Sequence, residues 1–373
     1  MANERMNNGE IRVKLSPSMG FILLFVTGMG LAYLIPYYDA AQICGPSGYW
    51  AVLSACILMI PFIFLISELQ HRFPQKNIFG AAIEIYGGIG GPFLNFIYLG
   101  ALIFQIIFVV HNTAELIVTY SLNRTPLWAI IILIMLTSVF FVKDGLIGVS
   151  RLAGFVFIPV LLFRILILIL ASHGMRLVQL LPIFSAGPIE YFKGGLSLAM
   201  LFFPIGIGLS FIYPLLSKPG KLKLVSGSLL GIQTLLTFFS VAIVIGVFGD
   251  IGLQSFVWPV FEAIRRIDVS FLALDQVGII FLIVWFTVFL TGLSLMLYIS
   301  GSEINQQFKK LDYRWCLWGS TLIIGAGAIS IPSLFYDVYV FTLMSRYSIA
   351  LIYVHPLLVY LGALIRRRGV KTV

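Results

Sequence analysis

The stretch LLFVTGMGLAYLIPYY, residues 23–38, belongs to an apolar segment long enough to cross a membrane, yet it contains two glycines and a proline. Glycine and proline weaken a helix, and in lipid every freed backbone N–H or C=O group needs a partner inside the protein. A span that served only as an anchor would gain stability from leucine or isoleucine at Gly28 and Gly30. We therefore expect this span to break at Gly28–Gly30, where bare backbone would serve a ligand.

The broad class of the protein follows from its composition. The chain has 373 residues, of which 60% are hydrophobic and only 10% are charged, and its mean hydropathy is +1.03. A soluble domain of this length carries far more charge. The 35 glycines suit packed membrane helices, in which small residues let backbones approach closely. The sequence predicts a polytopic membrane protein, whose net charge of +9 reflects topology rather than nucleic-acid binding.

No sequence motif indicates catalysis, a cofactor or a metal. The three cysteines, Cys44, Cys56 and Cys316, are widely separated, so neither a disulfide framework nor a metal site is expected. The chain has no HExxH helix and no nucleophile elbow. The glycine-rich GGIGG at 87–91 lacks the lysine and hydroxyl residue of a phosphate-binding loop and indicates a hinge. We expect a protein that is not an enzyme.

Hydropathy predicts ten membrane spans, because a crossing needs about 20 apolar residues. Their approximate limits are 17–38, 48–69, 91–119, 125–142, 148–171, 194–216, 223–248, 277–300, 315–334 and 339–365. With ten spans both termini lie on one side, which holds 17 lysines and arginines against five on the other. Basic residues mark the cytoplasmic side. The tails 1–14 and 367–373 are therefore expected in the cytoplasm.

The sixth predicted span repeats the feature of the first. It reads GGLSLAMLFFPIGIGLSFIYPLL and has Pro204, Gly206 and Gly208 near its middle. Interrupted spans at matching places in two halves are typical of inverted-repeat transporter folds. We expect one transmembrane domain over 1–373, with repeats at about 17–171 and 194–365. In such folds half-helix N-termini favour an anionic ligand group such as a carboxylate.

Polar side chains form stripes on two further spans. Gln105 and Asn112 share one face of the third span, and Thr287, Thr291 and Ser294 follow helical spacing on the eighth. Polar side chains in lipid face the bundle interior, where they either bond neighbouring helices or line a cavity. Together with the two interrupted spans, the stripes favour a central cavity.

Charged residues within the spans are few. Glu115, Arg164 and Arg346 need partners, because an isolated charge at the bilayer centre is costly. Arg164 lies in the outer half of its span, where it can reach the interface or pair with Glu115. A structural ion pair and ion coupling both remain open.

Three segments carry a family resemblance: GMGLAYLIP in the first span, RFPQKNIFGAAIEIYG after the second, and WPVFEAIRRIDVSFLALDQVGIIFLIVWF leading into the eighth. On these segments, and on the order of spans over nearly the whole chain, the sequence resembles the B subunits of the GerA-type spore germinant receptors. That family lies within the amino acid/polyamine/organocation transporter superfamily. The resemblance implies an all-α, LeuT-like fold with five plus five inverted spans.

The resemblance also implies a setting and a site. Family members reside in the inner spore membrane, assemble with a membrane-embedded A subunit and a lipoprotein C subunit, and sense small nutrients such as amino acids. The ligand would lie between spans 1, 3, 6 and 8. The expected contacts are backbone at Gly28, Met29, Gly30, Phe203, Pro204, Ile205 and Gly206, and the side chains of Gln105, Thr287 and Thr291.

Two functions from different classes follow from these observations. The first is a sensing subunit, in which nutrient binding shifts a conformational equilibrium that partner subunits read. The second is a proton-coupled amino acid permease, which needs an ionisable coupling group near its site. The charged candidates lie away from the two interruptions, which favours the sensor. The sequence does not identify the nutrient.

Overall fold

The computed structural model describes residues 14–31, 37–267, 277–308 and 311–366. Within these ranges the chain is helical, with no strand beyond one isolated bridge. Most of the predicted tails, residues 32–36 of the GMGLAYLIP motif, and residues 268–276 before the eighth span lie outside them. The helices are α1 Pro17–Leu31, α2 Tyr37–Cys44, α3 Ala51–Arg72, α4 Ile78–Tyr120, α5 Leu127–Val142, α6 Gly145–Ser172, α7 Pro188–Leu198, α8 Phe203–Ile212, α9 Leu222–Leu253, α10 Pro259–Arg265, α11 Val277–Gln307, α12 Tyr313–Ile329, α13 Leu334–Arg346 and α14 Ser348–Ile365.

The helices are those of a multi-pass membrane protein. Among the described residues, six helical stretches are long and apolar enough to cross a bilayer. The consecutive helices α12 and α13, bent by 118°, count as a seventh if they form one span, and α1 and α5 are shorter apolar helices. The predicted number of ten spans, their sidedness and the division into two repeats stay predictions.

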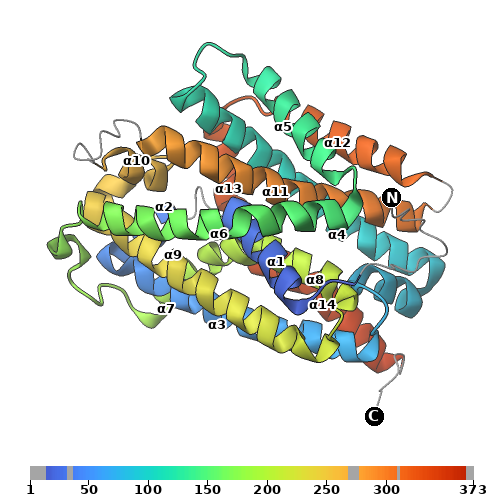
Figure 1. The fold of residues 1–373 in the computed structure, drawn as a ribbon. Coiled ribbons are helices and arrows are strands. Elements are labelled where there is room, and N and C mark those ends of the chain that lie inside the picture. The colour runs from blue at the N-terminus through green and yellow to red at the C-terminus, as the bar shows by residue number, and fades with distance from the viewer. Residues whose placement is uncertain (1–13, 32–36, 268–276, 309–310, 367–373) are drawn as a thin grey trace.

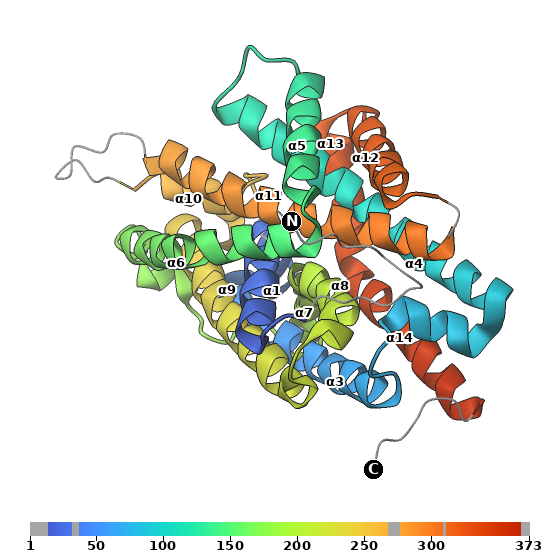
Figure 2. The ribbon, with the colours of Figure 1, turned by 45° about the vertical axis from the view of Figure 1, so that its right-hand side comes forward.

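The bundle surrounds two short central helices. Figures 1 and 2 both show α1 and α8 in the interior, between α11 on one side and α3 and α9 on the other. Helices α5 and α12 lie beyond α11 and form one edge of the bundle. Every residue of α8 is buried, which explains why its sequence is apolar on all faces.

The first helix is not interrupted where the sequence predicted. Helix α1 runs through Gly28 and Gly30 to Leu31, and the next helix begins at Tyr37. The predicted break at Gly28–Gly30 was therefore wrong, because the helix continues through both glycines. Two glycines weaken a helix by only about 1 kcal/mol each, which tertiary packing readily offsets.

Packing against α11 explains the glycines of α1. A Cβ atom on Gly30 would lie 2.5 Å from the Val288 carbonyl oxygen and 2.8 Å from Phe289 Cα. From the other side, a Cβ atom on Gly292 would lie 3.2 Å from Thr27 Cα. The two helices thus touch backbone to backbone, a contact that only small residues allow. Bare backbone at Gly30 serves a helix contact rather than a ligand.

The sixth predicted span is interrupted, as expected, but by a short 3-10 turn rather than by unwound backbone. Helix α7 ends at Leu198, residues 199–202 form a 3-10 turn, and α8 begins at Phe203 with Pro204 in its first turn. Proline is tolerated there because the first N–H groups of a helix have no partner within it. The backbone tightens rather than unwinds, and the change precedes Pro204 instead of following it.

Two other boundaries differ from the predicted spans. The predicted span 339–365 is divided at Tyr347, so that Arg346 ends α13 rather than lying in mid-span. The segment that follows the second predicted span forms the first part of α4, which turns at Gly87 with φ of 81°. A Cβ atom on Gly91 would meet Ile83 Cα, so the chain folds back closely after this turn.

The contact between α1 and α11 gives a stability prediction. Gly30→Ala should lower the free energy of unfolding by about 1–3 kcal/mol, because the methyl group meets backbone that cannot rotate away. The measurement is the thermal unfolding midpoint of the purified chain in detergent. Gly100→Ala on α4, where nothing lies within 4 Å of the added atom, is the matched control and should be neutral or stabilising. Equal effects of both changes would contradict the contact.

Candidate ligand site between α1, α4, α8 and α11

A small cavity lies between α1, α4, α8 and α11. Leu31 from the end of α1, Gln105 from α4, Phe203 and Pro204 from the start of α8 and Met296 from α11 line it, together with Leu102, Ile106 and Val109. These are the helices of the first, third, sixth and eighth predicted spans. The cavity volume is about 10 Å³, which holds at most one water molecule. A nutrient therefore needs the surrounding helices to move apart.

Gln105 supplies the polar group of this cavity. Its side chain is buried, and Nε2 donates only to Met200 Sδ at 3.6 Å. Its Oε1 atom has no hydrogen-bond partner among the described residues. An unsatisfied buried acceptor costs about 1–3 kcal/mol. A ligand that offers an N–H donor would remove this penalty.

The start of α8 offers little positive charge to this cavity. The Phe203 N–H already donates to the Met200 carbonyl of the 3-10 turn, so the positive end of α8 is weaker than the sequence predicted. The unpartnered Oε1 of Gln105 favours a ligand that donates a hydrogen bond over an anion.

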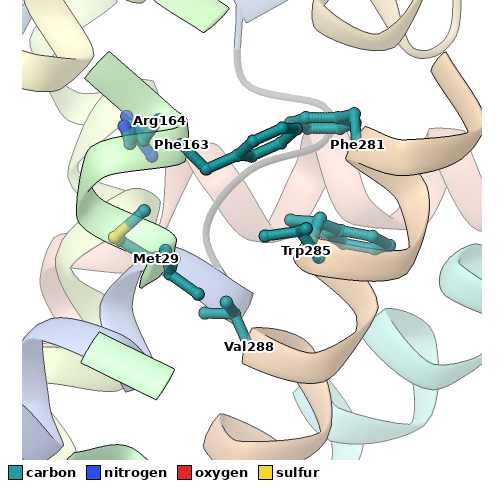
Figure 3. A pocket seen from close by; sticks show the side chains of 8 residues that line it. Met29, Phe163, Arg164, Phe281, Trp285 and Val288 are labelled. Carbon is teal, nitrogen blue, oxygen red and sulfur yellow. The ribbon is translucent and has the colours of Figure 1, made fainter. Parts of the chain in front are cut away.

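A second cavity lies on the other side of the end of α1. Its volume is about 30 Å³, and Figure 3 shows it between Met29 of α1, Phe163 and Arg164 of α6, and Trp285 of α11. Trp285 Nε1 is buried without a partner among the described residues. The sequence pointed to Met29 and Arg164 as candidate residues, but it gave no indication of Trp285.

Several predicted contacts pack helices together instead of lining either cavity. A Cβ atom on Gly28 would lie 2.6 Å from Ile205 Cδ1, so these two residues join α1 to α8. Gly206 faces away, with its nearest neighbours Ile352 at 3.4 Å and Phe62 at 3.5 Å. Gly28, Gly30, Ile205 and Gly206 therefore shape the site through packing.

The threonines of α11 do not line either cavity. The Thr287 hydroxyl donates to the Ile283 carbonyl at 3.0 Å, and the Thr291 hydroxyl donates to the Thr287 carbonyl at 2.9 Å. Ser294 on the same stripe also donates to the Ser138 carbonyl of α5 at 3.2 Å. Of this stripe, Ser294 follows the interhelical alternative, whereas Thr287 and Thr291 bond their own helix.

Several polar and charged groups of α4 and α6 have protein partners. Asn112 donates to Asp337 Oδ2 and accepts from Trp258 Nε1, both at 2.9 Å. Glu115 Oε1 lies 3.7 Å from His111 Nε2. Arg164 donates to Ser240 Oγ at 3.4 Å. Arg164 therefore contacts Ser240 and Glu115 lies near His111, in place of the expected pairing of Arg164 with Glu115.

Hydrogen bonds also join the segments that flank α1 to the rest of the bundle. Before α1, the Leu15 N–H donates to the Leu215 carbonyl at 2.7 Å, and the Ser217 N–H donates to the Leu15 carbonyl at 2.8 Å. In α2, Asp39 accepts from the Ser345 hydroxyl of α13 at 2.9 Å. Both Asp39 and Ser345 are buried. These contacts tie the segment before α1 to the segment after α8, and α2 to α13.

Helical spacing around Gln105 could have identified three further residues of the cavity lining. Leu102, Gln105, Ile106 and Val109 are spaced i, i+3, i+4 and i+7, which places them on one helical face with Gln105. Met200 and Met296 had no such signal, because nothing in the sequence relates them to α4.

Comparison with known proteins shows that this chain is similar in sequence to spore germination proteins. A family model described as "Spore germination protein" matches residues 14–349. Two curated proteins of Bacillus subtilis (strain 168) are similar over most of their length. Spore germination protein YndE is 21% identical over 78% of this chain and 79% of its own length. Spore germination protein KB is 22% identical over 80% of both.

Solved structures show the same fold in transporters. MhsT, solved in complex with L-phenylalanine, matches with a TM-score of 0.69 at 18% identity, over 95% of this chain and 99% of its own. Mhp1, a nucleobase-cation-symport-1 family transporter, matches with a TM-score of 0.67 at 13% identity, over 97% of this chain and 82% of its own. The LeuT-like fold predicted from the sequence is confirmed.

The unsatisfied acceptor of Gln105 can be tested by stability. Gln105→Met keeps the size of the side chain and removes the buried acceptor, so the free energy of unfolding should be unchanged or higher by up to about 1–3 kcal/mol. Asn95→Leu is the control, because Asn95 donates to the Phe79 carbonyl at 3.0 Å and bonds His355 Nε2 at 2.9 Å. That change should destabilise. A clear loss of stability in Gln105→Met would show that Oε1 is satisfied.

Proposed function

This chain belongs to the spore germination protein family, and from that premise we propose that it is the nutrient-sensing subunit of a spore germinant receptor. Family membership over residues 14–349 and a transporter-like fold support this role. In the proposal the germinant binds between α1, α4, α8 and α11, at the cavity that Gln105 lines.

We infer that the germinant is an amino acid held by its ammonium group. The unsatisfied Oε1 of Gln105 is the observation that carries this inference. A hydrogen bond from a charged donor to this acceptor contributes about 1.5–3 kcal/mol. The remaining lining of Leu31, Phe203 and Met296 suits the apolar part of a small ligand.

The setting of the receptor belongs to the same proposal. The chain would reside in the inner membrane of a spore and assemble with a membrane-embedded A subunit and a lipoprotein C subunit. The excess of lysine and arginine on one side supports ten spans with both tails, 1–14 and 367–373, in the cytoplasm. Interruptions in the first and sixth spans support repeats at about 17–171 and 194–365.

Sensing then follows from the small volume of the cavity. A ligand shifts an equilibrium only when it prefers one conformation. A cavity of about 10 Å³ excludes an amino acid, so the ligand must prefer a conformation in which α1 and α8 have separated. The bonds of Leu15 to the segment after α8, and of Asp39 to Ser345, are the contacts whose opening partner subunits would detect.

A proton-coupled permease is the alternative, favoured by the transporter fold of the solved neighbours. Such a permease needs an ionisable group at its site. Among the described residues, the lining of the cavity around Gln105 contains no charged residue. This difference favours sensing over coupled transport.

The proposed contact gives a dose-response prediction. Spores that carry Gln105→Met, with the partner subunits unchanged, should need about 13- to 160-fold more amino acid for half-maximal germination, which corresponds to the loss of one hydrogen bond from a charged donor of about 1.5–3 kcal/mol. The measurement is the rate of germination against concentration for each amino acid that triggers the unmodified spores.

Thr291→Val is the matched control for this experiment. It keeps the side-chain volume and removes a hydroxyl that bonds only its own helix, so the dose-response curve should not move. Identical curves for Gln105→Met and unmodified spores would remove Gln105 from the site. A shift of the dose-response curve with Thr291→Val would show that the polar stripe of α11 belongs to the ligand site.

Transport separates the two functions. The purified chain, reconstituted alone in liposomes with a proton gradient, should not accumulate a labelled amino acid that triggers germination. Binding of the same amino acid should still be detected by protection against thermal unfolding. Concentrative uptake that collapses with the proton gradient would defeat the sensor and establish the permease.

A further inference from the structure

A groove between α5 and α12 lies apart from the proposed ligand site. Its volume is about 440 Å³, far larger than either cavity beside α1 and within the range of about 300–1,000 Å³ typical of ligand pockets. Figures 1 and 2 show α5 and α12 side by side at the edge of the bundle. The groove therefore opens toward lipid rather than toward the interior.

The walls of the groove are apolar and aromatic. Leu136 and Phe140 of α5 are 51% and 59% exposed, and Trp318 of α12 is 41% exposed. Along the same helices, outside the groove, Leu133 and Leu322 are 58% and 68% exposed. In a membrane protein such side chains contact acyl chains, so a hydrocarbon occupant fits the groove better than a polar one.

Two cations lie at one end of this groove. Lys143 follows the last residue of α5, and Arg314 lies in the first turn of α12, and both are exposed. Lys143 Nζ lies 4.2 Å from the centre of the Phe140 ring. The described residues show no salt bridge for either cation, although Asp144 and Asp312 adjoin them in sequence. Asp312 instead accepts from the Arg314 backbone N–H at 2.9 Å.

We propose that this groove binds an anionic phospholipid, with one acyl chain along Leu136 and Trp318 and the phosphate between Lys143 and Arg314. Tyr313, which adjoins Arg314 in the lining, is an aromatic residue of the kind enriched at membrane interfaces. A zwitterionic lipid brings its own cation to the same place, so the site prefers a headgroup such as phosphatidylglycerol. An extended peptide segment fits less well, because it would place unpaired backbone groups against this apolar wall.

The test measures which lipid reaches Trp318. The full-length chain is reconstituted in vesicles of equal parts phosphatidylglycerol and phosphatidylcholine, in which one lipid or the other carries brominated acyl chains that quench tryptophan fluorescence. The Trp318 contribution is the difference between the unmodified chain and Trp318→Phe. We expect brominated phosphatidylglycerol to quench this contribution more strongly than brominated phosphatidylcholine. Equal quenching by the two lipids would overturn the proposal.

Paired charge variants make the test specific. Lys143→Gln/Arg314→Gln should lower the preference of Trp318 for phosphatidylglycerol by about fivefold per cation removed, the usual effect of a basic side chain near an anionic lipid surface. Lys218→Gln/Lys221→Gln removes the same charge from an exposed loop after α8 and should leave the preference unchanged. A preference that survives the first pair, or falls equally with the second, would overturn the site.

Discussion

The backbone contact between α1 and α11 is the constraint on which the site depends. Gly30 leaves no room for a side chain against Val288, and Gly292 approaches Thr27 from the opposite helix. Membrane helices gain little from the hydrophobic effect between one another, so small residues that permit close packing decide where two helices meet. This contact fixes the end of α1 and brings Leu31 beside Gln105 of α4 and Phe203 of α8.

The chemistry of the cavity follows from Gln105 and from the start of α8. The Oε1 atom of Gln105 has no hydrogen-bond partner among the described residues, whereas α7 passes into α8 through a 3-10 turn that keeps its backbone bonded. An unpaired acceptor beside bonded backbone favours an ammonium group. The described residues of the lining carry no charge.

The tightness of the same cavity suits a sensor. In the proposed function, the contacts of Leu15 with Leu215 and of Asp39 with Ser345 hold the closed form. A ligand shifts the conformational equilibrium by as much as it prefers the open form. Under the same proposal, movement of α1 and α8 would carry this preference to partner subunits.

The sequence by itself determined the membrane class, the LeuT-like fold, the placing of Gln105, Phe203 and Pro204 on helices that meet, and the interruption of the sixth span. Hydropathy, basic-residue bias and glycine spacing are local properties, which can be read from the sequence without knowing which helices pack together. Only the tertiary structure decided what Gly28 and Gly30 do, because a glycine that ends a helix and a glycine that admits another backbone look alike in one chain. It likewise assigned Thr287 and Thr291 to their own helix and Met296 to the cavity. Which face of α11 meets α1 depends on residues about 260 positions apart, and no periodicity within either helix contains that information.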